Sequence, residues 1–92
     1  MKSLVRPSYL RSLKRFSAKE VEDINTAISK LSESLGKPHI HSGLSVRKLR
    51  KAIFEIRADL KIRLLFARES GDIVLVFAGD HDEVRACVKS NT

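Results

Sequence analysis

Residues 52–67 alternate between apolar and polar side chains, and this period of two constrains the fold more than any other feature of the chain. In an extended strand, successive side chains point to opposite faces, whereas a helix repeats its apolar positions every three or four residues. Asp59 interrupts the alternation, and residues 70–72, Ser-Gly-Asp, form a hairpin-turn signal before the apolar run of residues 73–78. A run that is apolar on both faces is typical of a central strand. The pattern therefore predicts a mostly antiparallel sheet with short turns.

Two helical patterns precede these strands. Pro7 fits the first turn of a helix because its missing N–H would be unpaired there, and the apolar residues that follow have helical spacing. Ser17 and Glu20 form a capping-box pattern, which predicts the start of a second helix. Its apolar residues recur at steps of three and four, and Gly36 and Pro38 supply its end. The apolar stripe of this second helix consists of Val21, Ile24, Ile28, Leu31 and Leu35.

Helices followed by a meander of strands indicate an α+β fold class. We expect one domain over residues 1–92, in which an N-terminal helical hairpin packs on a small, mostly antiparallel sheet of three to four strands. The remaining segments fit a short edge strand at residues 2–6, a loop at 36–43 and a short C-terminal helix or turn at 80–88.

Most of the positive charge of the chain lies in the strand region. The formal net charge is +7, and residues 44–68 carry eight Lys or Arg against two acidic residues, a local balance of +6. Cations held on a sheet form an ordered basic surface, for which a polyanion is the default partner. We expect the densest part of this surface to hold phosphates; it consists of Arg47, Lys48, Arg50 and Lys51.

The cysteine and histidine content argues against several classes of site. Cys87 is the only cysteine, so the chain has no internal disulfide, and we interpret Cys87 as a small buried residue rather than a nucleophile. Together with His39, His41 and His81, it lacks the spacing of a zinc-ligand set, and we expect no metal. The sequence contains no signal-peptide pattern and no apolar segment long enough to span a membrane, which favours a reducing cytoplasm.

Four short motifs follow the helical region in a characteristic order. A basic run at residues 47–50 (RKLR) precedes FEIR at 54–57, IRLLF at 62–66 and, after an apolar strand, GDHDEV at 79–84. In order and spacing, these motifs resemble the RelE/ParE superfamily of bacterial type II toxins. The resemblance implies a small toxin that a partner antitoxin neutralises. RelE-like members cut messenger RNA in the ribosomal A site without a metal, whereas ParE-like members poison DNA gyrase.

The same resemblance assigns candidate site residues. Arg63 falls on the arginine of the family's central strand motif, and Arg57 falls on a basic position of the preceding strand. His81 lies near the basic or histidine position that follows the last strand. Arg85 falls where many ribosome-dependent members have tyrosine or phenylalanine. This departure removes an aromatic ring that would stack on a base or accept a proton.

These residue types suit cleavage of a phosphodiester in RNA. The reaction needs a base for the 2′-OH proton, a cation for the extra charge on the phosphate and an acid for the leaving 5′-oxygen. Arginine donates two parallel hydrogen bonds and stays charged, so Arg57 and Arg63 are the candidates for the phosphate. His81 is the candidate acid or base because an unperturbed imidazole titrates near pH 6.5, with Glu55 or Asp59 as the fallback base.

Each candidate also has a purely structural interpretation. Arg57 with Glu55, and Arg63 with Asp59, would form ordinary surface ion pairs worth about 0–1 kcal/mol. His81 would cap the last helix or bond a backbone group. The basic run would be a solvated strand face or a surface that the antitoxin covers. Tyr9 would be a core residue, and His39 and His41 would be solvated loop residues.

Three functions therefore remain open. The first is a ribosome-dependent mRNA endonuclease, the second a gyrase poison, and the third a non-catalytic nucleic-acid-binding protein or a decayed toxin. The expected partners are an antitoxin with an acidic, amphipathic segment, the ribosome and mRNA, with no small-molecule cofactor and no membrane.

Overall fold

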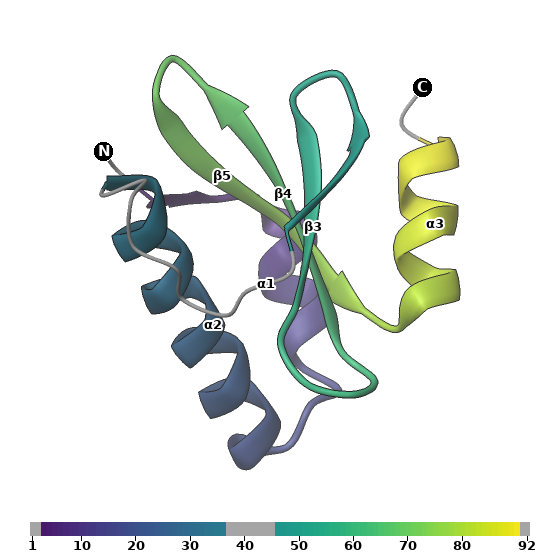
Figure 1. The fold of residues 1–92 in the computed structure, drawn as a ribbon. Helices are drawn as coiled ribbons and strands as arrows, with labels where there is room; N and C mark the ends of the chain where they lie inside the picture. The colour runs from purple at the N-terminus through teal and green to yellow at the C-terminus, as the bar shows by residue number, and fades with distance from the viewer. Residues whose placement is uncertain (1–2, 37–45, 91–92) are drawn as a thin grey trace.

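The computed structural model describes residues 3–36 and 46–90, and these residues form three helices and a five-stranded sheet (Figure 1). The N-terminal helices pack on the sheet, so the predicted α+β class is confirmed. No helix in these two segments is long and apolar enough to cross a membrane. In chain order, the elements are β1 (Ser3–Val5), α1 (Pro7–Leu13), α2 (Ala18–Gly36), β2 (Arg47–Arg50), β3 (Ile53–Arg57), β4 (Arg63–Glu69), β5 (Asp72–Gly79) and α3 (His81–Ser90).

The strands lie in the order β1-β5-β4-β3-β2. Neighbouring strands are antiparallel except for β1, which pairs with β5 in the parallel direction. The sheet thus has five strands rather than the expected three to four. The additional strand is β2, because the basic run Arg47–Arg50 pairs with β3 as a strand of its own, whereas β1 matches the edge strand expected at residues 2–6.

The two turns of the meander form where turn residues interrupt the alternation. The Asp59 carboxylate accepts hydrogen bonds from the backbone N–H groups of Lys61 (2.7 Å) and Ile62 (2.9 Å), which closes the β3–β4 connection. Between β4 and β5, Ser70 has φ 50° and Gly71 has φ 86°. Two successive residues in the left-handed region are typical of the tight hairpin turn whose twist matches the flanking strands.

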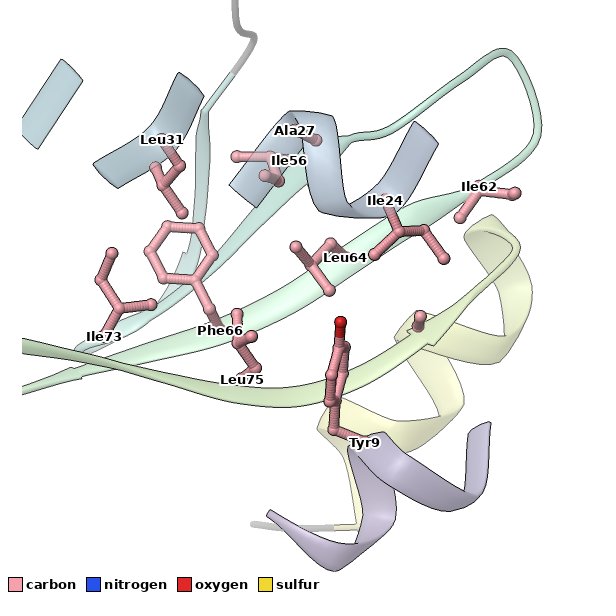
Figure 2. Packing of buried hydrophobic residues seen from close by; sticks show 11 residues of the cluster. Tyr9, Ile24, Ala27, Leu31, Ile56, Ile62, Leu64, Phe66, Ile73 and Leu75 are labelled. Atoms are coloured by element: carbon pink, nitrogen blue, oxygen red, sulfur yellow. The ribbon is translucent and has the colours of Figure 1, made fainter. Parts of the chain in front are cut away.

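Helix α2 covers one face of the sheet and contributes Ile24, Ala27 and Leu31 to the buried core. Its capping box forms as predicted, since the Ser17 N–H donates to Glu20 Oε1 (2.8 Å) and the Glu20 N–H donates to Ser17 Oγ (3.1 Å). Ile24 and Leu31 are fully buried, and Figure 2 shows them pointing toward Leu64 and Phe66 of β4. Val21 and Ile28 of the predicted stripe are half-buried, whereas Ala27, outside that stripe, is buried; the side chain of Leu35 lies outside the described part of the structure.

Helix α1 lies along the edge of β5 beyond the point where β1 ends. The Ser8 hydroxyl donates to the carbonyl oxygen of Val76 (2.7 Å), and the Ala78 N–H donates to Ser12 Oγ (3.0 Å). These two serines therefore satisfy backbone groups that a neighbouring strand would otherwise pair. Between them, Tyr9 is buried in the core as predicted, and this burial raises the pKa of its hydroxyl.

Helix α3 packs on the other side of the sheet from α2 (Figure 1). Val84 is fully buried and Val88 is half-buried. The first turn is closed by a second capping box, in which the Glu83 N–H donates to Asp80 Oδ1 (2.8 Å) and the Asp80 N–H donates to Glu83 Oε1 (2.9 Å). The predicted C-terminal segment is thus a helix that begins at the end of β5.

Candidate functional site

Three of the predicted site residues lie at one end of the sheet. Arg57, the last residue of β3, lies directly opposite Arg63, the first residue of β4. Arg63 in turn lies opposite Gly79, the last residue of β5, and His81 begins α3 two residues later. Residues directly opposite on antiparallel strands have Cβ atoms about 4.5–5.5 Å apart. The two arginine side chains therefore leave the same face of the sheet at neighbouring positions.

The structural interpretation of these arginines as ion-paired residues is wrong. Arg57 and Arg63 take no part in the ion pairs found among the described residues, which include Arg6–Glu69, Arg15–Glu83 and Lys19–Asp23. Asp59, the expected partner of Arg63, instead accepts the hydrogen bonds that close the β3–β4 turn. Arg57 is exposed and Arg63 is half-buried, so both guanidinium groups are available to an anion.

Glu55 occupies a more central place than the sequence indicated. It lies two residues before Arg57 on the same face of β3, and its register partners are Leu65 of β4 and Arg47 of β2. Its exposure is only 5%, which is rare for a carboxylate. The surrounding cations are visible in the sequence and make Glu55 only a fallback base, whereas its burial is not visible in the alternating pattern.

His81 does not cap α3, because Asp80 and Glu83 form the cap. It is instead an exposed residue whose Nε2 accepts a hydrogen bond from Nε of Arg85, at 3.0 Å. A guanidinium can only donate, so Nε2 of the imidazole is the acceptor in this contact. Arg85, which stands where the resemblance expects an aromatic ring, thus contacts the histidine directly.

The basic run on β2 is divided between the two faces of the sheet. Arg47 lies opposite Glu55, on the face that carries Arg57 and Arg63. Lys48 lies opposite Phe54, which packs against the α2 core, so Lys48 belongs to the other face. Lys51 is an exposed residue in the turn after β2. The structure therefore does not bring Lys48 and Lys51 to the arginine pair.

Two grooves flank α3 on the side of the sheet that faces away from α2. One, of about 520 Å³, lies between β2 and α3 and is lined by Arg50, Arg85 and Lys89 among others. The other, of about 680 Å³, has an aliphatic floor that includes Leu65 and Val76. Cys87 lines this second groove and is half-buried rather than buried.

No cluster of three or more His, Cys, Asp or Glu side chains suited to a metal ion occurs in residues 3–36 and 46–90. Of the loop predicted at residues 36–43, Gly36 is the last residue of α2, and the rest, with His39 and His41, lies outside the described residues.

Solved structures of toxins have the same fold as this chain. A RelB-RelE antitoxin-toxin complex from Methanococcus jannaschii contains a chain that superposes with a TM-score of 0.70 at 13% identity, over 91% of this chain and 96% of that one. A copper-bound mutant toxin from Helicobacter pylori gives 0.67 at 17% identity, over 91% and 98%. A YoeB/ParE toxin from Agrobacterium tumefaciens gives 0.65 at 18% identity, over 88% and 99%.

No protein-family model and no curated protein sequence matches the chain. The likeness thus lies in the three-dimensional arrangement and covers almost the whole of each compared chain. Helices packed on a mostly antiparallel five-stranded sheet, with a last helix that returns to the opposite face, give this chain the RelE-like toxin fold.

Proposed function

We propose that this chain is the toxin of a type II toxin–antitoxin system and that it cleaves messenger RNA on the ribosome, in the cytoplasm and without a metal or small-molecule cofactor. The observation that carries the proposal is the cross-strand pair Arg57–Arg63 at the end of the sheet where His81 begins α3, on a RelE-like fold. An RNA phosphate placed between the arginines would bring its ribose within reach of the imidazole.

In this mechanism, the 2′-oxygen of the RNA attacks the adjacent phosphorus and the bond from phosphorus to the 5′-oxygen breaks. Arg85 turns from His81 to the RNA backbone, and the released Nε2 accepts the proton of the 2′-OH. Arg57 and Arg63 stabilise the negative charge that develops on the phosphate. Water protonates the leaving 5′-oxygen. Glu55, on the same face, is the second candidate for the base.

The partner that we propose is an antitoxin with an acidic, amphipathic segment. Two properties support it: the chain has a net charge of +7, and one of the structures with this fold is an antitoxin-toxin complex. An acidic partner would cover the basic face of β2–β4 and keep it from mRNA and the ribosome.

The test is expression of the chain in bacteria that lack the antitoxin, followed by primer extension across an abundant translated mRNA. Wild type should arrest growth and produce cuts within the reading frame. Arg63→Ala should lower the cleavage rate on the order of 100- to 1,000-fold, because it removes one preorganised donor to the developing anion. Arg11→Ala, which removes an exposed arginine of α1, should leave the cuts unchanged.

Each of the other outcomes excludes this function. Growth arrest with intact transcripts and inhibited supercoiling would identify a gyrase poison. Absence of arrest would indicate a decayed or purely nucleic-acid-binding protein. Full cleavage by Arg63→Ala would remove the arginine pair from the mechanism.

A further inference from the structure

A single arginine after α1 connects the N-terminal helices to the start of α3. Arg15 forms an ion pair and hydrogen bond with the Glu83 carboxylate through Nη1. Its Nη2 donates to the carbonyl oxygen of Ala78, at 3.3 Å. Arg15 and Glu83 are separated by 68 residues in the chain. One side chain therefore contacts both the last residues of β5 and the first turn of α3.

Two aromatic rings hold the guanidinium group of Arg15 in place. Its Cζ lies 5.2 Å from the ring centroid of Phe16 and 5.8 Å from that of Phe77. Contacts with two rings and two oxygen acceptors restrict the guanidinium more than one ion pair would, although the Arg15 side chain is 45% exposed. This arrangement differs from an ordinary surface ion pair, in which two long side chains move independently.

Glu83 links Arg15 to the backbone at the start of α3. One carboxylate oxygen contacts Arg15 and the other accepts from the Asp80 N–H, so one side chain serves both the ion pair and the capping box. The hydrogen bond from Arg15 is the main reason that the pKa of Glu83 lies below its usual range. The same bond raises the pKa of Arg15, so both groups stay charged at neutral pH.

The residues around Gly79, at the junction between the end of β5 and the start of α3, are tightly packed. A Cβ added there would lie 2.7 Å from Phe77 Cε2, 2.9 Å from Arg15 Nη2 and 3.1 Å from Glu83 Cβ. Gly79 is also the register partner of Arg63. The Arg15–Glu83 contact is therefore built against the residue that lies opposite the candidate phosphate-binding arginine.

We infer that Arg15 is a positioning residue, which acts through Glu83 to hold the first turn of α3 so that His81 and Arg85 lie beside Arg63. The inference rests on the proposed function for its catalytic consequence. If the junction loosens, His81 moves relative to Arg63 although neither side chain has changed. Displacement of a reacting group by about 1 Å can cost on the order of 100-fold in rate.

The test uses variants that separate this role from helix capping. Glu83→Gln removes the charge that pairs with Arg15 but keeps a capping-box side chain, since glutamine also serves at that position. Arg15→Gln removes the other partner. Arg11→Gln is the matched control, because it makes the same charge change at an exposed site in α1. Thermal unfolding of all three shows which variants are folded at the assay temperature.

The first measurement is the kinetics of mRNA cleavage on programmed ribosomes. We expect kcat to fall about tenfold to 100-fold in Glu83→Gln and in Arg15→Gln, with KM within about twofold of wild type. The double variant should be no slower than the slower single variant, because both substitutions break the same Arg15–Glu83 contact. A kcat within twofold of wild type in both folded single variants would overturn the inference.

The second measurement does not depend on catalysis. Nitrogen-15 NMR of the imidazole rings should show that His81 in wild type has an unprotonated Nε2 and a proton on Nδ1, with His81→Gln used to assign its signals. These signals should shift in Glu83→Gln and Arg15→Gln but not in Arg11→Gln. Unchanged His81 signals in both variants would refute the positioning role. A wild-type protein that cuts no mRNA would refute the proposed function, while the NMR comparison still decides the role of Arg15.

Discussion

Arg57 and Arg63 stand directly opposite each other on adjacent strands, an arrangement that opposes folding. Like charges at such positions repel and weaken the strand pair. No described acidic residue forms an ion pair with either one. A pair of this kind is stable in the fold because other contacts compensate for it, and it becomes favourable when an anion binds between the two groups.

This repulsion predicts opposite effects on stability and activity. Arg57→Gln should raise the free energy of unfolding by a few tenths of a kcal/mol, because it relieves the cross-strand repulsion. The same variant should cleave mRNA on the order of 100-fold more slowly if Arg57 binds the developing anion. Urea denaturation and the cleavage assay measure the two effects.

Arg47→Gln is the control because Arg47 lies opposite Glu55 rather than another cation. It should leave the free energy of unfolding unchanged or slightly lower. A loss of stability in Arg57→Gln equal to that in Arg47→Gln would contradict the repulsion argument.

At the scale of elements, α1 occupies the part of the β5 edge that β1 does not cover. Strand β1 covers residues Ile73, Val74 and Leu75, and the serines of α1 bond the backbone at Val76 and Ala78. Ser12 is 7% exposed, and its hydroxyl also donates to the carbonyl oxygen of Tyr9 at 2.6 Å. The hydroxyl therefore links a buried helix turn to a buried strand edge.

Ser12→Ala should destabilise the fold by about 1–3 kcal/mol, because it leaves the buried N–H of Ala78 without its acceptor. Ser8→Ala should cost less, since Ser8 is only half-buried and the Val76 carbonyl can bond water. Urea denaturation gives the two free energies, and hydrogen exchange should be faster at the Ala78 amide in Ser12→Ala. Equal losses in the two variants would contradict the difference in burial.

The sequence predicts those elements that have a local signal. The capping box at Ser17 and Glu20 and the turns at Asp59 and Gly71 form where expected, because each depends on residues within four positions of one another. The parallel pairing of β1 with β5 and the docking of α1 through Ser12 depend on residues more than sixty positions apart. No periodicity in the sequence encodes those contacts.

The candidate site divides in the same way. Arg57, Arg63 and His81 were predicted, and the strand register brings them to one end of the sheet. Their placement depends on the register between neighbouring strands, which the alternating pattern alone does not determine. A shift of one residue would move Arg57 to the opposite face of the sheet. Arg15 was missed since its neighbours in the chain are ordinary helix-end residues. The later Asp80–Glu83 capping box was the one local sign that Glu83 had a structural role.

For the whole molecule, the face away from α2 combines cations from four elements with few acids. Arg47 and Arg50 of β2, Arg57 of β3, Arg63 of β4 and Arg85 of α3 contribute to it. Binding of polyanions to such a surface releases counterions, so affinity falls as salt rises.

For a single-stranded RNA oligonucleotide, the slope of log affinity against log salt should change by about 0.7 for each phosphate contact that is lost. The variant Arg47→Gln/Arg50→Gln should therefore reduce the slope by about 1.4. The control Lys14→Gln/Lys30→Gln makes the same change in net charge on the N-terminal helices and should leave the slope nearly unchanged. Fluorescence anisotropy at several salt concentrations measures this slope. Equal slopes for the two double variants would indicate that RNA binding depends on net charge alone.

The parallel pairing of β1 with β5 also sets the time at which the protein can complete its fold during synthesis. Ser3 pairs with Ile73, so the first strand has no partner until 70 more residues have been made. At about 5–20 residues per second, that interval lasts roughly 4–14 s. Throughout it, β1 has no β5 to pair with and α1 has no strand edge to contact. A nascent chain therefore cannot complete the five-stranded sheet until β5 has been made, although β2, β3 and β4 are synthesised earlier.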